Sequence, residues 1–348
     1  MRIDIEERVL HFKQPAGTSR GVYTTRRLWL VKVSDGETVG YGECAPLPQL
    51  SCDDIPNYAE VLRRFCDEVE RTGEIDYEAM RDYPSMLFGL ETALLDLRNH
   101  PSPITHHPSP ILFDTPFSRG EVGIPINGLV WMGTFEEMQQ RIEEKLAQGF
   151  HCVKLKIGAI DFDAELELIK KIRSRYSHHE IELRVDANGA FSFDEALYKL
   201  ELLSQYALHS IEQPIKAGQW SYMSELCRES PLPIALDEEL IGVNDPDQKR
   251  QMLNIIRPRY IILKPSLHGG MMGVREWVDI AGDMGIGSWI TSALESNIGL
   301  NAIAQLTADI YGPDIRMPQG LGTGQLFTDN IPMPLEIRGD RLWRVNSL

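Results

Sequence analysis

The sequence predicts an α/β fold in which parallel strands and helices alternate and close into a TIM-type (β/α) barrel. Five short apolar runs each end in charged residues, namely Lys154 and Lys156, Asp186, Glu212, Asp237 and Lys264. They recur at intervals of 25 to 30 residues, enough for one strand, one helix and two loops. Charges at the C-terminal ends of successive parallel strands lie where such a barrel carries its active site.

Alternation within these runs indicates which side chains face the barrel interior. In residues 153–157 the apolar side chains share one strand face and both lysines share the other. A solvated strand face would explain one such run, but parallel strands separated by helices have no solvated face. We therefore expect the charged side chains to point into the barrel mouth, with Arg184 on the same face as Asp186.

The chain length indicates two domains. The 348 residues accommodate a barrel of about 250 residues and a further domain of about 100. We assign residues 1–118 to an N-terminal α+β capping domain and residues 119–331 to the barrel. Residues 332–348 are expected to return to the capping domain.

The capping domain is predicted from an alternating N-terminal pattern followed by amphipathic and apolar helical patterns. Glycine, proline and serine mark its connecting loops. In chain order, the pattern predicts strands at 3–12, 26–33 and 38–43, loops at 14–21 and 44–51, and helices at 55–71 and 84–98.

Helices are predicted between the barrel strands. Thr134 is the expected N-cap of a helix at 134–148, with Glu136 and Glu137 in the first turn, where the helix dipole favours carboxylates. The other elements are a first strand at 122–128, helices at 161–176 and 192–206, a strand at 288–291, a glycine-rich eighth unit at 317–324, and a final strand at 335–345 that pairs with the N-terminal sheet.

Composition narrows the class of partner. The net charge of −16 argues against nucleic acid or an anionic membrane as a partner. The N-terminal residues lack a signal-peptide pattern, and no apolar run reaches membrane-spanning length. Five scattered cysteines without a C-x-x-C pair are typical of reduced thiols in a cytoplasmic protein. A monomer and a symmetric oligomer fit the sequence equally.

Three of the charged strand ends predict a metal site. Asp186, Glu212 and Asp237 would converge and repel one another unless a cation lay between them. All-oxygen ligation suits Mg²⁺, with Mn²⁺ as a substitute, and zinc is disfavoured because no His or Cys lies at these ends. Alternation favours Asp237 over its neighbour Glu238 as the third ligand.

The lysines predict proton abstraction next to a carboxylate. Lys156 and Lys264 fall on opposite sides of the expected metal, and the nearby positive charge of Lys154 favours loss of a proton from Lys156. A lysine base facing a metal-bound small-molecule carboxylate is suited to removing the α-proton, while the metal and the second lysine hold the enediolate charge.

The motifs resemble those of the enolase superfamily. K-x-K, D-A-N, I-E-Q-P, L-D-E and L-K-P occur at βα spacing, as in the muconate-lactonizing-type branch with lysines on strands two and six. Residues 318–331 (PQGLGTGQLFTDNI), supported by Thr291 to Ser296, are most similar to the o-succinylbenzoate synthase family of dehydratases. The resemblance covers essentially the whole chain.

This resemblance implies a role for each matching residue. Asp186, Glu212 and Asp237 would bind Mg²⁺, Lys156 would take the α-proton and return it to the departing hydroxyl in a syn elimination, and Lys264 would stabilise the enolate. Lys154 would support Lys156. Two capping-domain loops would close over the substrate, which is expected to contact Arg184, Arg20, Thr291, Ser292 and Gly322. For Arg184, packing against Asp186 is an equally good account.

Three other functions are considered: two enzymes that would use the same charged residues, and a binding module that would use none of them for catalysis. A dipeptide or N-acylamino acid epimerase would use both lysines as opposed acids and bases, but its Asp-x-Asp motif is missing at 320–324. A muconate-type cycloisomerase is a further enzyme reading. A non-catalytic binding module is disfavoured because buried charges without a partner are costly.

Overall fold

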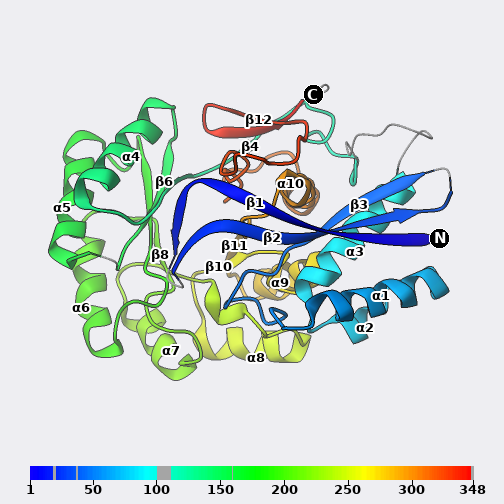
Figure 1. Cartoon of the computed structure of the whole chain (residues 1–348). Coiled ribbons are helices and arrows are strands. Elements are labelled where there is room, and N and C mark those ends of the chain that lie inside the picture. Colours follow the sequence, from blue (N-terminus) through cyan, green and yellow to red (C-terminus); the bar gives the residue numbers. More distant parts are fainter. Residues whose placement is uncertain (19–20, 37, 100–110, 159, 346–348) are drawn as a thin grey trace.

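The computed structural model describes residues 1–18, 21–36, 38–99, 111–158 and 160–345 (Figure 1). An antiparallel sheet with three helices forms the capping domain, and a curled parallel sheet with outer helices forms the barrel. This arrangement confirms the predicted fold class. None of the described helices is both long enough and apolar enough to cross a membrane.

The capping domain packs helices on one face of a three-stranded sheet. Its elements are β1 (Arg2–Thr18), β2 (Gly21–Ser34), β3 (Val39–Cys44), α1 (Tyr58–Thr72), α2 (Tyr77–Met80) and α3 (Pro84–Asn99). Helix α3 lies directly on β3, because a Cβ at Gly42 would collide with the backbone of Gly89. The buried core between the sheet and the helices includes Val31, Leu62 and Leu90.

The segment predicted as a flexible loop at 14–21 is mostly strand, so that prediction is wrong for the described residues. β1 and β2 pair as one long hairpin in which Ala16 lies opposite Tyr23, after a register shift that begins at His11. Residues 12–15 do not pair with β2, and Pro15 among them has no backbone N–H to donate. In Figure 1 the two dark blue strands extend from the capping domain across the barrel. Arg20 lies outside the described residues.

Within the described ranges, seven parallel strands form the barrel sheet in the order β11-β10-β9-β8-β7-β6-β5. Their bounds are β5 (Gly128–Val130), β6 (Cys152–Lys156), β7 (Glu182–Asp186), β8 (Ser210–Glu212), β9 (Ile234–Leu236), β10 (Tyr260–Leu263) and β11 (Gly287–Ile290). The helices between and after them are α4 (Phe135–Ala147), α5 (Phe162–Arg175), α6 (Phe193–Ser204), α7 (Trp220–Glu229), α8 (Pro246–Ile256), α9 (Gly270–Asp283) and α10 (Asn297–Tyr311). Thr134 caps α4 as predicted.

The glycine-rich segment expected as the eighth unit links β11, at one edge of this sheet, to the segment that leads into β5 at the other edge. Gly320 N–H donates to the Ile290 carbonyl over 2.9 Å, and the Gln319 carbonyl accepts from Asn127 N–H, the residue before β5, over 3.0 Å. A Cβ at position 320 would collide with Thr291, so only glycine allows this close approach.

The C-terminal tail does not join the N-terminal sheet, and that prediction is wrong. β12 (Leu335–Arg338) and β13 (Arg341–Arg344) form a hairpin, and β13 pairs with β4 (Ile124–Pro125) at the start of the barrel. The expected first barrel strand is therefore divided between β4 and β5. Residues 326–328 contact β1 instead, where Lys13 N–H donates to the Leu326 carbonyl over 2.8 Å.

Candidate active site

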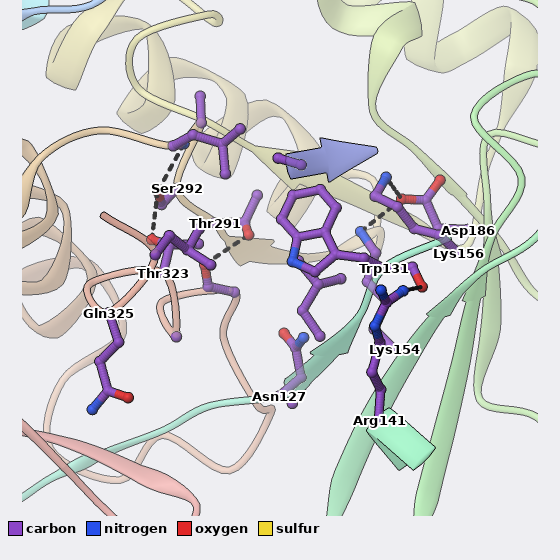
Figure 2. Close-up of a pocket in the computed structure, with 18 of the residues that line it drawn as sticks. Asn127, Trp131, Arg141, Lys154, Lys156, Asp186, Thr291, Ser292, Thr323 and Gln325 are labelled. Atoms are coloured by element: carbon purple, nitrogen blue, oxygen red, sulfur yellow. Dashed lines mark hydrogen bonds and ion pairs between the residues drawn. The ribbon is translucent and has the colours of Figure 1, made fainter. Parts of the chain in front are cut away.

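The charged strand ends meet at one cavity. Strand register places Lys156 beside Asp186 and Asp186 beside Glu212, so these side chains form one layer across β6, β7 and β8. A cavity of about 390 Å³ opens at this end of the barrel, and Lys154 and Lys264 also line it. Figure 2 shows Lys154 and Lys156 directed toward Asp186. The inward orientation predicted from alternation is thus observed for both lysines.

Each of the three lysines is paired with a carboxylate from another strand. Lys156 Nζ donates to Asp186 Oδ2 over 2.9 Å. Lys154 Nζ lies 3.0 Å from the same oxygen and also donates to Glu212. Lys264 follows β10, four places from β6 in the sheet order, and its Nζ donates to Asp237.

These ion pairs set the protonation of the buried groups. Burial lowers the pKa of Lys154, but Asp186 and Glu212 outweigh burial and hold that pKa above its ordinary value. Burial raises the pKa of Asp186, but Lys154 and Lys156 outweigh it and keep that pKa below its usual range. Lys154 therefore stays positively charged beside Lys156.

At the strand ends between β6 and β10, carboxylates outnumber ammonium groups. The four acids there are Asp186, Glu212, Asp237 and Glu238, and the three ammonium groups belong to Lys154, Lys156 and Lys264. Burial, with Asp186 next in size, raises the pKa of Glu212 well above its usual range. Burial followed by Asp237 raises the pKa of Glu238 to about 6. The site therefore has an excess of acidic groups that are costly to ionise without a further cation.

Buried oxygen atoms at this site also lack hydrogen-bond partners. Glu212 Oε1, Asp237 Oδ1 and Glu238 Oε2 accept no hydrogen bond from the described residues. Carboxylate oxygens are the ligands that Mg²⁺ prefers, so the donor set fits a hard divalent cation. In the described part of the chain, no three His, Cys, Asp or Glu side chains are gathered as in a preformed metal site. Lys154 Nζ instead lies between Asp186 and Glu212, and the ligand assignment stays a prediction.

Alternation cannot decide between Asp237 and Glu238. Strand β9 ends at Leu236, and Asp237 precedes a short 3₁₀ helix, Glu238–Leu240. Beyond the strand end the two-residue alternation no longer holds, and both carboxylates face the site. Asp237 is buried against Lys264, whereas Glu238 lines the cavity and accepts a hydrogen bond from Asn188 Nδ2 over 2.9 Å.

Asn188 is a site residue that the sequence analysis did not select. Lys156 Nζ donates to Asn188 Oδ1 over 2.7 Å, so Asn188 bridges Lys156 and Glu238. Its φ of 44° is in the left-handed region, which asparagine tolerates better than most residues. An asparagine two residues after Asp186 was the signal available in the D-A-N motif.

Arg184 does not line the cavity, and its predicted contact with substrate is corrected. Its side chain is 2% exposed and lies one layer below Asp186, beside Lys154 in the register. Its guanidinium donates to Glu182 over 2.7 Å and to the Pro318 carbonyl over 2.9 Å, so its hydrogen bonds are made below the cavity. Alternation identifies the strand face but not the depth in the barrel.

Three of the other predicted substrate contacts line the cavity. Thr291 and Ser292 follow β11, and Gly322 lies in the eighth unit opposite them. Ser292 Oγ donates to Glu295 over 2.8 Å and accepts from Thr323 Oγ1 over 2.8 Å. The cavity wall on this side therefore consists of small polar residues held by their own hydrogen bonds.

Trp131 is a second residue that the sequence analysis missed. It follows β5 and lines the cavity, and Figure 2 shows its indole ring between Thr291 and the lysine pair. The half-buried ring packs with the apolar cluster that contains Phe12 of the capping domain. Arg141 Nη1 donates to the Trp131 carbonyl over 3.1 Å and fixes the loop that carries the ring.

Two family models match the chain. The model described as Enolase C-terminal domain-like matches residues 137–341, and the model described as MenC, N-terminal domain matches residues 18–97. Together they cover most of the barrel and most of the capping domain.

Matches to individual proteins extend over nearly the whole chain and belong to the same family. The o-succinylbenzoate synthase of Desulfotalea psychrophila is 46% identical over 98% of both chains. The crystal structure of MenC from Desulfotalea psychrophila matches with a TM-score of 0.81 and 43% identity over 99% of both chains. The L-Ala-D/L-Glu epimerase from Bacillus subtilis also has a TM-score of 0.81, over 99% of this chain and 96% of its own, at 20% identity. At 20% identity, the similarity to the epimerase concerns the fold alone.

Proposed function

We propose the activity of this chain from its family, because the chain belongs to the enolase superfamily and, within it, to the o-succinylbenzoate synthase family. It is a lyase that dehydrates 2-succinyl-6-hydroxy-2,4-cyclohexadiene-1-carboxylate to o-succinylbenzoate in menaquinone biosynthesis. The identity of 46% across the whole chain carries this proposal, since the epimerase match is far lower in identity. We place the reaction in the cytoplasm, with a small-molecule carboxylate as substrate and no nucleic acid or membrane partner.

Lys156 is the proposed base and acid. Its Nζ takes the proton from the ring carbon next to the carboxylate, and the electron pair of that C–H bond forms the new C=C bond. The C–O bond to the neighbouring hydroxyl breaks, and the proton on Lys156 leaves with that hydroxyl as water. One group on one face of the ring serves both steps, so the elimination is syn. Asn188 and Asp186 hold Nζ in place.

Lys264 and Lys154 supply fixed positive charge. Lys264 comes from the opposite side of the sheet order and stays charged, because Asp237 and Glu212 outweigh the burial that lowers its pKa. Its ammonium would stabilise negative charge on the substrate as the α-proton leaves, through electrostatic attraction to the ring. Lys154 would keep Lys156 in position and maintain positive charge beside it.

Asp186, Glu212 and Asp237 would hold Mg²⁺, which Mn²⁺ would replace. The excess of carboxylates and the unpaired oxygens of Glu212 and Asp237 support this assignment. When bound, the metal would stabilise the charge that develops on the substrate carboxylate.

Thr291, Ser292 and Gly322 are the proposed contacts of the succinyl side chain. All three line the cavity, and Figure 2 shows Thr291 and Ser292 on the other side of the Trp131 ring from the lysine pair. Within the described residues, the backbone N–H of Gly322 donates to no acceptor. A backbone amide that is free to donate suits a carboxylate or carbonyl oxygen.

Replacing Trp131 with alanine is expected to raise KM for the cyclohexadiene substrate about tenfold, with a smaller effect on kcat. The indole ring provides an apolar wall beside the reacting ring, and its loss removes binding that ground state and transition state share. Steady-state kinetics at saturating Mg²⁺ measures this. Trp131→Phe is the matched control and should stay within about threefold of wild type. An unchanged KM for Trp131→Ala would show that the ring does not contact substrate.

A direct assay tests the proposed function. Purified protein with Mg²⁺ is mixed with the cyclohexadiene substrate, and loss of its absorbance is followed. In parallel, dipeptides are incubated in deuterium oxide and examined for deuterium at the α-carbon. Fast dehydration supports the proposal. Deuterium uptake without dehydration would favour the epimerase, which shares the fold, and the absence of both reactions would favour a binding module.

A further inference from the structure

Arg26 on β2 is a buried cation that lies between the two domains. Its side chain is 2% exposed and does not line the cavity. Its guanidinium donates to four carbonyls beyond its own strand: Nη2 to Ala45 over 2.6 Å, Nη1 to Pro46, Nε to Leu294 over 3.1 Å, and Nη2 to Ala293 over 3.4 Å. Two of these carbonyls belong to the capping domain and two to the barrel.

Both segments that Arg26 contacts form cavity wall. Residues 44–51 contribute Leu47 and Leu50 to the cavity, and residues 291–296 contribute Ser292 and Leu294 among others. A guanidinium has donors in a rigid planar fork, so it fixes the relative position of the carbonyls that accept from it. One side chain outside the cavity thus holds two of its walls together.

The barrel segment has a strained backbone that needs such support. Leu294 has a φ of 65°, which is rare for a large side chain and costs free energy unless its surroundings enforce it. Arg26 is not the only group that holds this turn. Leu294 N–H also donates to Ser292 Oγ over 3.0 Å, and Glu295 accepts from the Ala293 N–H over 2.6 Å. The turn is therefore held from the barrel side and from the capping side.

Two buried carboxylates balance the charge of Arg26. Burial lowers the pKa of the Arg26 guanidinium, and Glu295 and Glu43 oppose that effect. Glu43, on β3, accepts from the Ser296 N–H over 2.8 Å and from the Gly299 N–H over 2.9 Å at the start of α10. Glu295 accepts from Ser266 Oγ over 2.7 Å. Capping domain and barrel are thus joined at the substrate wall by charged groups that are all buried.

We infer that Arg26 is a positioning residue for substrate specificity. By binding carbonyls of 44–51 and 291–296 together, it sets the shape of the wall that receives the succinyl side chain, without touching substrate. The inference rests on the proposed function, because the substrate whose binding it affects is the cyclohexadiene carboxylate.

Arg26→Met and Arg26→Lys test this role against a matched control. Arg81 also joins the two domains, since its Nη1 donates to the Asn244 carbonyl over 3.1 Å and to Glu276 over 3.0 Å, but it does not line or border the cavity. Arg26→Met is expected to raise KM about tenfold or more while kcat changes less than about threefold. The KM of Arg26→Lys should lie between those of wild type and Arg26→Met, because lysine can donate to fewer carbonyls. Arg81→Met should leave KM unchanged. Both methionine variants are expected to unfold at a lower temperature than wild type.

Amide hydrogen exchange provides a readout that needs no activity. Residues 44–51 and 291–296 should exchange faster in Arg26→Met and Arg26→Lys, and not in Arg81→Met. If wild type does not dehydrate the substrate, the proposed function fails, while faster exchange in both segments still supports the role of Arg26. Lower stability of the Arg26 variants with unchanged KM and unchanged exchange would overturn the inference. If Arg26→Met does not fold, the same two measurements on Arg26→Lys decide.

Discussion

Replacing Lys156 with alanine is expected to lower kcat for dehydration by at least about 10³-fold. The side chain is the proposed acceptor of the α-proton, and in the described part of the chain its Nζ lies against Asp186 and Asn188 at the cavity. The initial rate of substrate loss at saturating Mg²⁺ measures the effect. A single-turnover experiment shows whether the chemical step, and not product release, has become slower.

Lys156→Arg separates base chemistry from charge. Arginine keeps a cation beside Asp186 but does not lose its proton in proteins, so this variant should be as inactive as the alanine variant. Lys170→Ala, on the exposed surface of α5, is the matched control and should keep wild-type kinetics. Lys156→Arg with activity near wild type would contradict a role for Lys156 as the base.

Removal of the divalent metal is expected to abolish dehydration, and added Mg²⁺ should restore it. The carboxylate excess and the unpaired oxygens of Glu212 and Asp237 are the reason, because the metal would supply the missing charge. Mg²⁺ should also raise the unfolding temperature of wild type, since a ligand that binds only the folded state stabilises it. Kinetics with a chelator and thermal unfolding with a Mg²⁺ titration measure the two effects.

Variants of the acidic residues identify the ligands. Glu212→Gln and Asp237→Asn should lose the Mg²⁺-dependent rise in unfolding temperature, whereas Glu238→Gln should keep it. Full activity of wild type in excess chelator would contradict a metal-dependent reaction. Loss of the Mg²⁺ effect in Glu238→Gln but not in Asp237→Asn would instead make Glu238 the third ligand.

Alternation along the strands determined the inner face of the barrel from the sequence. Parallel strands covered by helices leave one face for charged residues, so Lys154, Lys156 and Asp186 were oriented before the structure was known. The regular βα spacing also predicted the order of the barrel strands and the eighth unit. These features depend on residues that are near one another in sequence or that belong to the same βα repeat.

Features that depend on distant partners were predicted less well. The tail was assigned to the wrong sheet because β13 shares the same alternation whether it pairs with β4 or with the capping sheet. Arg184 was placed in the cavity because alternation defines a face and not a depth. Trp131 was missed since its role arises from packing between two domains.

Short repeating patterns and motifs were enough to predict the fold class, the set of charged residues and the family of reaction. Three features became visible in the folded chain alone: Asn188 bridges Lys156 and Glu238, Arg26 joins two cavity walls, and the tail pairs with β4. The physical reason is that hydrogen bonds and packing between distant segments depend on three-dimensional position. A local pattern specifies direction along a strand or helix, but not the partner that the folded chain brings to it.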